Sequence, residues 1–228
     1  MENALQTQTP IFSPPSPSSS DDAADTVPIE LVPFHPVIER AEIVHKIQRS
    51  LMAMETIFTD YERACVPVCD DVTKCSRCAH RLSVVSYMLA RSDARVWEVW
   101  AETASGLDVV GILYLTRIVP GVDAVAHYAF FDGKVRSRTS IMEAAISWLF
   151  SPNPSWSVLP LQRVSLEIPD YAFALAHHAT KHLGFGGPFR WKHTNGKSIP
   201  VEGVKPNYIQ WRGSARNLLL LGRLAPDG

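Results

Sequence analysis

The stretch FFDGKVRSRTSIMEAAISWLF, residues 130–150, is the part of the sequence that decides the fold. Its first residues complete an apolar run typical of a strand, a polar loop follows, and apolar residues then recur with helical spacing. A loop that ends at a helix start offers backbone N–H groups to an anion, which is a common way to bind phosphate. The stretch has no glycine between Gly133 and the helix, although glycine lets a phosphate approach the backbone closely.

Three strands are expected immediately upstream of this stretch. Residues 95–103, 108–120 and 124–132 are rich in β-branched and aromatic residues, and the sequences SGLD and PGVD between them are typical of tight turns. Consecutive strands joined by short turns form an antiparallel meander. Before the meander, the sequence predicts one short strand and two helices, at residues 29–35, 38–58 and 80–92.

A second strand and helix are expected downstream. Residues 161–169 have the composition of a strand, and residues 171–185 predict a helix that Gly184 closes at its C-terminal end. The remaining apolar segments are expected to form terminal strands or hairpins, at residues 187–193, 208–213 and 217–224. This element order predicts an α+β fold with a mixed, mostly antiparallel sheet and helices on both faces.

Composition limits the organisation and the class of protein. The 228 residues carry a net charge of −1, which is enough chain for one well-filled core and argues against a general nucleic-acid binder. The Pro- and Ser-rich residues 1–27 are expected to be a disordered arm, and residues 28–228 a single domain. No apolar run is long enough for a membrane span, and no secretory signal is recognisable, so a cytoplasmic location is expected.

The order of these elements resembles the GNAT acyltransferase superfamily over roughly residues 29–224. The sequence AHYAFFD stands at the position of the family's central strand, and the loop and helix after it stand where the family binds the pyrophosphate of acetyl-CoA. The sequence VSLEIPDYAFALAHHATKHLGF looks like the family's next strand and helix. The segments FFDGKVRSR and WRGSARNLLLLGRL are closest in style to GNAT-like proteins of phages and prophages. The resemblance implies a twisted sheet flanked by helices.

The resemblance also implies a set of residues for the acetyl-CoA pyrophosphate. They are Lys134, Arg136, Ser137, Arg138, Thr139 and Ser140. Basic side chains and hydroxyls can bind phosphate oxygens, but side chains replace the glycines of the family pattern, which implies weak or altered CoA binding. The alternative is a basic, solvated loop whose Ser and Thr residues only cap the helix.

Two residues are candidates for the base that accepts the amine proton in an acyl transfer. Glu167 lies on the strand expected at residues 161–169, and His127 lies on the central strand expected at residues 124–132. The alternatives are that His127 is only a half-buried residue of the sheet and that Glu167 only faces solvent, neither with a catalytic role. Thr180 stands where the family often has its acidic tyrosine, and Phe173 where it often has an asparagine, which weakens the interpretation as an enzyme.

All four cysteines lie within an insert at about residues 61–80. Their spacing is Cys65-x3-Cys69-x5-Cys75-x2-Cys78, and four thiolates form a tetrahedral zinc site when they converge. Such a site would be structural. The loop between the two pairs is shorter than in ordinary zinc ribbons, so four free thiols remain an alternative, and two disulfides are a third.

Two functional hypotheses follow. The first is a GNAT-like enzyme that transfers an acetyl group from acetyl-CoA to an unknown amine. The second is a catalytically degenerate GNAT-like protein with a structural or interaction role, such as a component of a phage virion. In the second case the protein would be located in the virion, and the N-terminal arm or the apolar residues 217–224 would contact a partner.

Overall fold

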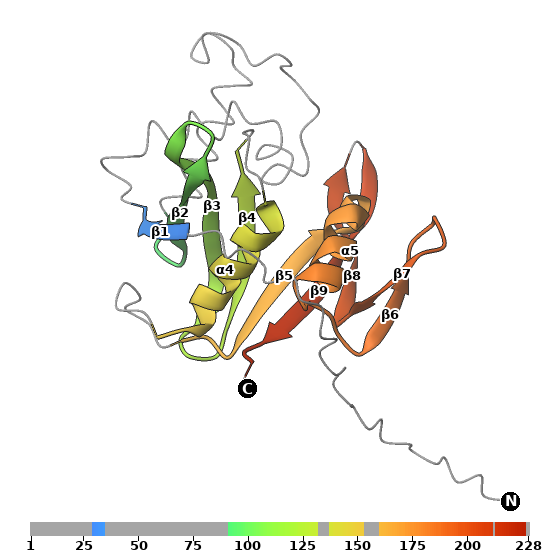
Figure 1. The fold of residues 1–228 in the computed structure, drawn as a ribbon. Helices are drawn as coiled ribbons and strands as arrows, with labels where there is room; N and C mark the ends of the chain where they lie inside the picture. The colour runs from blue at the N-terminus through green and yellow to red at the C-terminus, as the bar shows by residue number, and fades with distance from the viewer. Residues whose placement is uncertain (1–28, 35–90, 132–136, 153–159, 212, 227–228) are drawn as a thin grey trace, which may run out of the picture.

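The computed structural model describes residues 29–34, 91–131, 137–152, 160–211 and 213–226. This part of the chain contains nine strands, two α-helices and one 3-10 turn (Figure 1). The expected helix at residues 38–58, the N-terminal arm, the cysteine insert and residues 80–90 of the second expected helix lie outside it, while residues 91–92 are described and are not helical.

The elements follow one another in the expected order. The strands are β1 (Ile29–Pro33), β2 (Arg95–Thr103), β3 (Gly106–Val119), β4 (Asp123–Phe130), β5 (Arg163–Pro169), β6 (Phe189–Lys192), β7 (Ser198–Val201), β8 (Gly203–Trp211) and β9 (Ser214–Leu224). The helices are α4 (Arg138–Phe150) and α5 (Phe173–His182), and the 3-10 turn η1 (Asp170–Ala172) leads into α5. The strand β7 and the 3-10 turn η1 were not expected from the sequence, while the other described elements were.

Seven of the strands form one sheet, in the order β1-β2-β3-β4-β5-β9-β8. Every neighbouring pair is antiparallel except β4 and β5, which are parallel because α4 connects them. The strands β6 and β7 form a separate two-stranded sheet. The prediction of a mixed, mostly antiparallel sheet flanked by helices is therefore confirmed.

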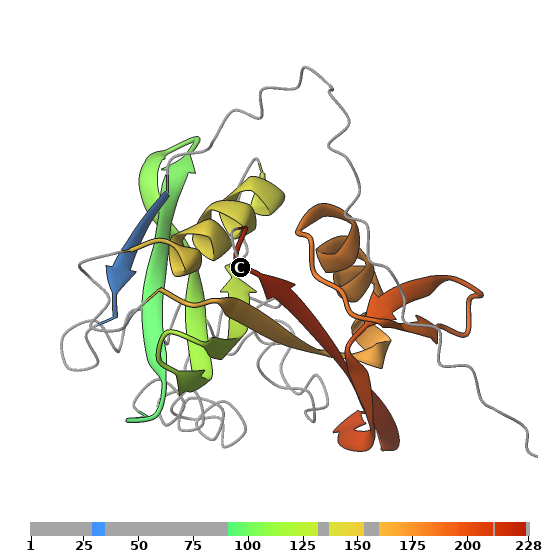
Figure 2. The same ribbon diagram turned by 90° about the horizontal axis from the view of Figure 1, so that it is seen from below.

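The sequence predicted helices on both faces of the sheet, but both described helices lie on the same face, α4 over one half and α5 over the other (Figures 1 and 2). Helix α4 buries a continuous apolar face made of Ile141, Met142, Ala145, Ile146 and Leu149. Beside it, Trp148 packs edge-on against Trp97 of β2, with 5.4 Å between ring centroids. Each large side chain buried in this way contributes about 1.5–3 kcal/mol, so the helix is held by packing against the sheet.

Helix α5 ends as the sequence predicts. Gly184 follows the last turn with φ of +67°, a left-handed conformation that glycine adopts without strain. The N–H groups of Leu183 and Phe185 both donate to the carbonyl of Ala179, which closes the helix. Phe185 is buried, so this ending also directs the chain back into the core.

The apolar segment near the C-terminus has a different role from the one expected. Residues 217–224 were considered a surface for a partner, but they belong to β9, which pairs with β5 on one side and β8 on the other. Leu219 and Leu221 of this strand are fully buried. The segment is apolar because it is an interior strand of the sheet, and the expectation of a partner surface there was wrong.

Candidate functional site

The two central strands separate soon after they meet. The parallel pairing of β4 with β5 runs only from Asp123↔Arg163 to Val125↔Ser165, whereas β5 stays paired with β9 along its whole length. Beyond Val125 the strands diverge, as Figure 1 shows. Along this part of β4 the only strand pairing in the described structure is with β3, so the edge that faces β5 offers backbone hydrogen-bonding groups to a ligand.

A bulge in β3 accompanies this divergence. The β3–β4 register shifts between Thr116 and Val119, and Arg117 within the shift has φ of +49°. Bulges increase the local twist of a strand pair, which favours the separation of β4 from β5. The left-handed conformation at Arg117 also turns its side chain toward the face of the sheet opposite α4, where it contacts Glu167.

Helix α4 begins close to the open end of the divergence. Ser137 caps it, because its hydroxyl accepts a hydrogen bond from the N–H of Ser140 at 3.3 Å. The first turn has no acidic residue, and Arg138 is its first residue. The guanidinium of Arg138 lies over the ring of Phe130, 5.5 Å from its centroid. This helix start therefore combines a positive dipole end with a cation, which suits an anion.

Four of the six residues predicted for the pyrophosphate lie at this helix start. They are Ser137, Arg138, Thr139 and Ser140, while Lys134 and Arg136 lie outside the described residues. The hydroxyls of Ser137 and Ser140 form a hydrogen bond with each other, with 2.7 Å between their oxygens. The capping that the sequence offered as an alternative role is thus present, and it does not remove the positive dipole end of the helix.

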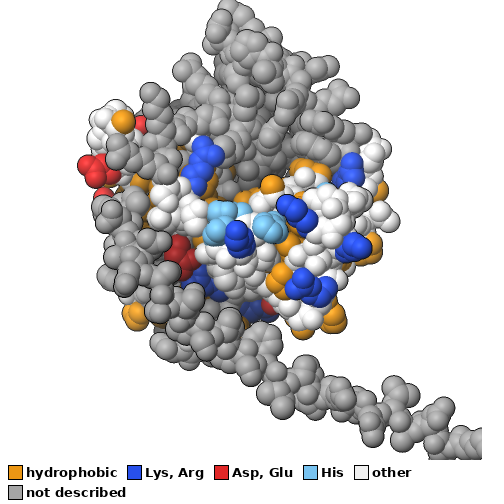
Figure 3. Space-filling model, turned by 45° about the vertical axis from the view of Figure 1, so that its right-hand side comes forward, with side chains coloured by type: hydrophobic (Ala, Val, Ile, Leu, Met, Phe, Trp, Pro, Cys, Tyr) orange, Lys and Arg blue, Asp and Glu red, His pale blue; other side chains and the backbone are white. Residues whose placement is uncertain are grey.

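A residue that the sequence did not single out for this site also contacts the helix start. The Nε2 atom of His178 in α5 lies 3.1 Å from the Thr139 hydroxyl, which links the two helices. Burial and the neighbouring His182 and His177 lower the pKa of His178. Residues 171–201 contain four Lys or Arg residues, four histidines and no acidic residue. Figure 3 shows histidines beside Lys and Arg side chains on this surface.

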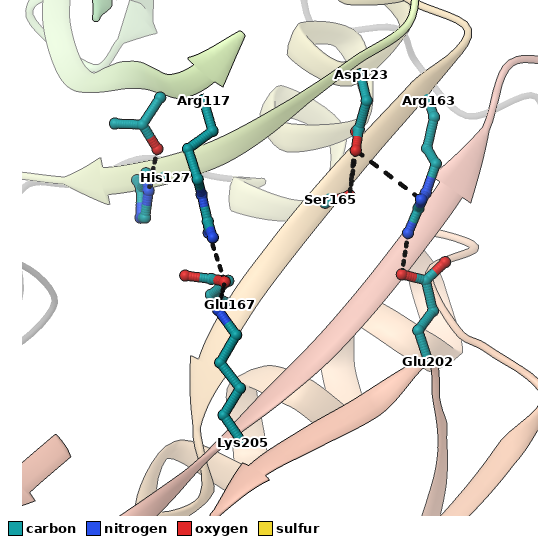
Figure 4. Close-up of polar contacts among 9 residues, drawn as sticks. Arg117, Asp123, His127, Arg163, Ser165, Glu167, Glu202 and Lys205 are labelled. Carbon is teal, nitrogen blue, oxygen red and sulfur yellow. Dashed lines mark hydrogen bonds and ion pairs between the residues drawn. The ribbon is translucent and has the colours of Figure 1, made fainter. Parts of the chain in front are cut away.

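The two candidate bases lie on one face of the sheet, on opposite sides of the divergence (Figure 4). His127 belongs to β4 and Glu167 to β5, and their neighbours in each strand face the core on the other side. The structure thus places both on the sheet face opposite α4, although the divergence separates the strands that carry them.

Glu167 is bound by two cations. Its Oε1 forms an ion pair with Arg117 of β3 and accepts a hydrogen bond from the Lys205 ammonium of β8 at 2.8 Å. Burial alone would raise the pKa of Glu167, but the hydrogen bonds and charges of Arg117 and Lys205 outweigh it and lower the pKa below its ordinary value. Glu167 is therefore a carboxylate at neutral pH and a weak base.

His127 is neutral at physiological pH. Burial lowers its pKa to about 4, with Glu167 acting in the opposite direction and Arg117 in the same direction. Its Nε2 lies 3.1 Å from the hydroxyl of Thr116, and its ring packs against Tyr114 with centroids 5.5 Å apart. The ring is thus held in place and has an unprotonated nitrogen, which is the form that can accept a hydrogen bond from an amine.

A second polar cluster joins the strands where they are still paired. Asp123 of β4 accepts a hydrogen bond from the Ser165 hydroxyl of β5 at 3.1 Å, and lies 3.9 Å from the guanidinium of Arg163. Arg163 also forms an ion pair with Glu202, which follows β7 (Figure 4). These contacts hold the closed end of the two strands together while the other end diverges.

Tyr128 lies beyond the last β4–β5 pair, on the face of β4 toward α4. Its hydroxyl is buried and has no hydrogen-bond partner in the part of the chain that the structure describes. Burial raises the pKa of Tyr128 well above its ordinary value. Sequence reasoning missed this residue because an alternating strand pattern shows which face a tyrosine shares but not whether its hydroxyl finds a partner.

The described residues contain no group of three or more His, Cys, Asp or Glu side chains that could hold a metal ion. The predicted ligands Cys65, Cys69, Cys75 and Cys78 lie outside these residues, so the zinc site stays a prediction. Among the described helices, none has the length and apolar character required to cross a membrane.

The fold is similar to that of solved acetyltransferase structures. No family model and no curated protein matches the sequence. One similar structure is a probable acetyltransferase of the GNAT family from Chromobacterium violaceum, with 14% identity and a TM-score of 0.54, covering 95% of this chain and 97% of the other. Another is the spermidine N-acetyltransferase from Vibrio cholerae in complex with CoA and spermine, with 12% identity and a TM-score of 0.51, covering 86% and 95%. The protein therefore has the fold of the GNAT superfamily.

Proposed function

We propose that the protein transfers an acetyl group from acetyl-CoA to an amine. The observation that carries this proposal is the divergence of β4 from β5 beside the N-terminus of α4. The open edge of β4 offers backbone groups to an extended, amide-containing chain such as the pantetheine arm of CoA. The helix start offers its dipole and Arg138 to a pyrophosphate. One ligand with an amide chain joined to a pyrophosphate would use both features.

The residues at the helix start fit this ligand. Arg138 can pair with a phosphate oxygen, and the hydroxyl of Thr139 can donate a hydrogen bond to another. The basic surface of α5 and the β6–β7 hairpin would attract a ligand with several negative charges, because residues 171–201 contain no acidic side chain to repel it. These features compensate in part for the glycines that the loop lacks.

The acceptor amine would lie on the opposite face of the sheet, beside His127 and Glu167. The carboxylate of Glu167 is already paired with Arg117 and Lys205, whereas the imidazole of His127 forms no ion pair in the described structure. We therefore assign to His127 the hydrogen bond that orients the neutral, nucleophilic amine, and to Glu167 the role of holding Arg117 and Lys205 on this face of the sheet. The similar Vibrio cholerae structure contains spermine, which supports an amine as the acceptor class.

The proposal is tested by thiol release from acetyl-CoA in the presence of a panel of amines that includes spermidine, an amino acid and a lysine peptide. Amine-dependent release that saturates with acetyl-CoA and is lost in a His127→Ala variant is the expected result. Thiol release that does not depend on any amine would contradict transfer to an amine.

The alternative of a catalytically degenerate GNAT-like protein stays a prediction based on the glycine-poor loop and on Thr180. The hydroxyl of Thr180 donates to the carbonyl of His177 at 3.0 Å, so it is engaged within α5. If this alternative holds, neither acetyl-CoA binding nor amine acetylation will be measurable.

A further inference from the structure

The buried hydroxyl of Tyr128 is the most unusual polar group in the described structure. A buried donor without a partner costs about 1–3 kcal/mol of stability, and phenylalanine would fill the same space without that cost. The other buried side-chain atom without a partner is Oδ1 of Asp170, but Oδ2 of the same carboxylate accepts two hydrogen bonds from Asn217. Tyr128 has one polar side-chain atom, and its entire hydrogen-bonding capacity is unused.

The position of Tyr128 connects it with the proposed cofactor site. It lies three residues beyond the last β4–β5 pair, at Val125, where the strands have separated. Its ring contacts that of Phe130, 4.5 Å between centroids, and the ring of Phe130 contacts the guanidinium of Arg138 at the start of α4. Tyr128, Phe130 and Arg138 thus follow one another along the diverging edge, from its interior to the helix start.

We propose that the Tyr128 hydroxyl is a catalytic group that donates a hydrogen bond to the sulfur atom of bound acetyl-CoA. The inference rests on the proposed function and adds a residue to it. A ligand that places its phosphates at the start of α4 and its arm along β4 brings its distal end into the interior of the divergence. The distal functional group of acetyl-CoA is the thioester, whose sulfur needs a donor when the C–S bond breaks.

The role of the hydroxyl follows from the chemistry of the transfer. The amine nitrogen forms a bond to the carbonyl carbon, the C–S bond breaks, its electron pair leaves on sulfur, and the amine proton passes to solvent. Burial raises the pKa of Tyr128, so the phenol keeps its proton throughout. It therefore acts as a hydrogen-bond donor to the developing thiolate and stabilises the charge that forms on sulfur.

The first experiment compares the wild-type protein with Tyr128→Phe in the pH dependence of CoA binding, measured by calorimetry between about pH 7 and pH 9.5, a range that covers thiol ionisation. The wild type is expected to bind CoA more tightly as the thiol ionises, because Tyr128 stabilises the thiolate. In Y128F this gain is expected to fall by about tenfold. Tyr208→Phe is the control, since Tyr208 is 59% exposed on β8 and should behave as the wild type.

The second measurement is the melting temperature of the same three proteins without ligand. Because the hydroxyl has no partner in the described structure, Y128F is expected to melt at the same temperature as the wild type or higher. An active wild type should also lose at least tenfold in kcat on this substitution, with little change in the KM for the amine.

The outcomes separate this inference from the proposed function. Equal pH dependence of CoA binding in the wild type and Y128F would overturn the role of Tyr128 while leaving the CoA site intact. A lower melting temperature in Y128F would also overturn it, because the hydroxyl would then have a structural partner. No CoA binding by the wild type at millimolar concentration would overturn both the proposed function and the role of Tyr128.

Discussion

Arg117 of β3 forms an ion pair with Glu167 of β5 across the intervening strand β4. The contact lies where the hydrogen-bonded ladder between β4 and β5 has ended, so side chains replace backbone hydrogen bonds there. Lys205 of β8 reaches the same carboxylate from the other side. Glu167 thus links the two halves of the sheet on the face opposite α4.

Replacing Glu167 by glutamine is expected to destabilise the protein by about 1 kcal/mol at pH 7, because Arg117 is 53% exposed and the ion pair is partly screened. The folded-state pKa of Glu167 is lowered, so its contribution is present above its unfolded pKa of about 4.3 and is lost as the pH falls through the folded value. Urea denaturation at a series of pH values should show the difference between wild type and E167Q closing below about pH 4.3.

The control is Glu102→Gln, which changes an exposed glutamate on β2. Its free energy of unfolding should match that of the wild type within about 0.5 kcal/mol at every pH. A difference between wild type and E167Q that persists unchanged at low pH would show that the charge of Glu167 is not what joins the strands.

His127 is expected to remain neutral through the physiological range. Its pKa is about 4 in the folded protein and about 6.5 in the unfolded chain, so the unfolded chain binds more protons between these values. The free energy of unfolding that depends on a neutral His127 is therefore fully present above about pH 6.5 and is lost as the pH falls toward 4. Between pH 7 and pH 4.5 the free energy of unfolding should therefore fall by about 2–3 kcal/mol more in the wild type than in His127→Gln.

The ionisation of His127 can also be followed directly in the wild type by the 15N chemical shifts of the imidazole ring. The shifts should keep the values of a neutral ring down to about pH 5. A transition centred near pH 6.5 would contradict the buried, neutral histidine that the proposed acceptor site requires.

Ser137→Ala is expected to destabilise the protein by about 1 kcal/mol, because it removes the side-chain cap of α4. Ser137→Gly should cost only a few tenths of a kcal/mol. Ser147→Ala, an exposed change within the same helix, should not destabilise it. Thermal denaturation of the three variants gives the ranking, and equal stability of S137A and the wild type would mean that the cap contributes nothing.

Gly111→Ala is expected to destabilise the protein strongly, by about 2–4 kcal/mol. A Cβ atom at Gly111 of β3 would lie 2.6 Å from the carbonyl oxygen of Ala129 and 3.3 Å from the Cα of Phe130 in β4. The clash is with backbone, which cannot move without opening the β3–β4 pair beside the site.

A matched control for this variant is Gly203→Ala in β8. A Cβ at Gly203 would meet only a Leu220 side-chain atom, at an ordinary distance of 3.6 Å. Denaturation midpoints of the two variants measure the difference. If G111A were as stable as G203A, the close approach of β3 to β4 would be contradicted.

The sequence predicts the elements well because their signals are local. The meander, the helix after Ser137 and the turn at Gly184 follow from residue spacing, turn residues and the left-handed preference of glycine. The position of β9 could not be predicted in this way, because an apolar strand reads the same whether it pairs inside the sheet or with another molecule. Its pairing with β5 depends on contacts between distant residues.

The candidate site was predicted in part. Glu167 and His127 were identified as candidates, and the structure places them on one face of the sheet, but the sequence gives no sign that Arg117 and Lys205 bind Glu167. Arg117 reaches Glu167 only because of its bulge and left-handed backbone. The unused hydroxyl of Tyr128 is likewise a property of its surroundings, which no motif in the sequence encodes.

The central claim is that the diverging strands and the start of α4 form an acetyl-CoA site, and calorimetric titration of the 228-residue chain with acetyl-CoA tests it most directly. Saturable binding with one site per chain, a dissociation constant on the order of 1–100 micromolar and weakening by about tenfold in Arg138→Ala is the predicted result. No heat of binding at millimolar acetyl-CoA would contradict the account.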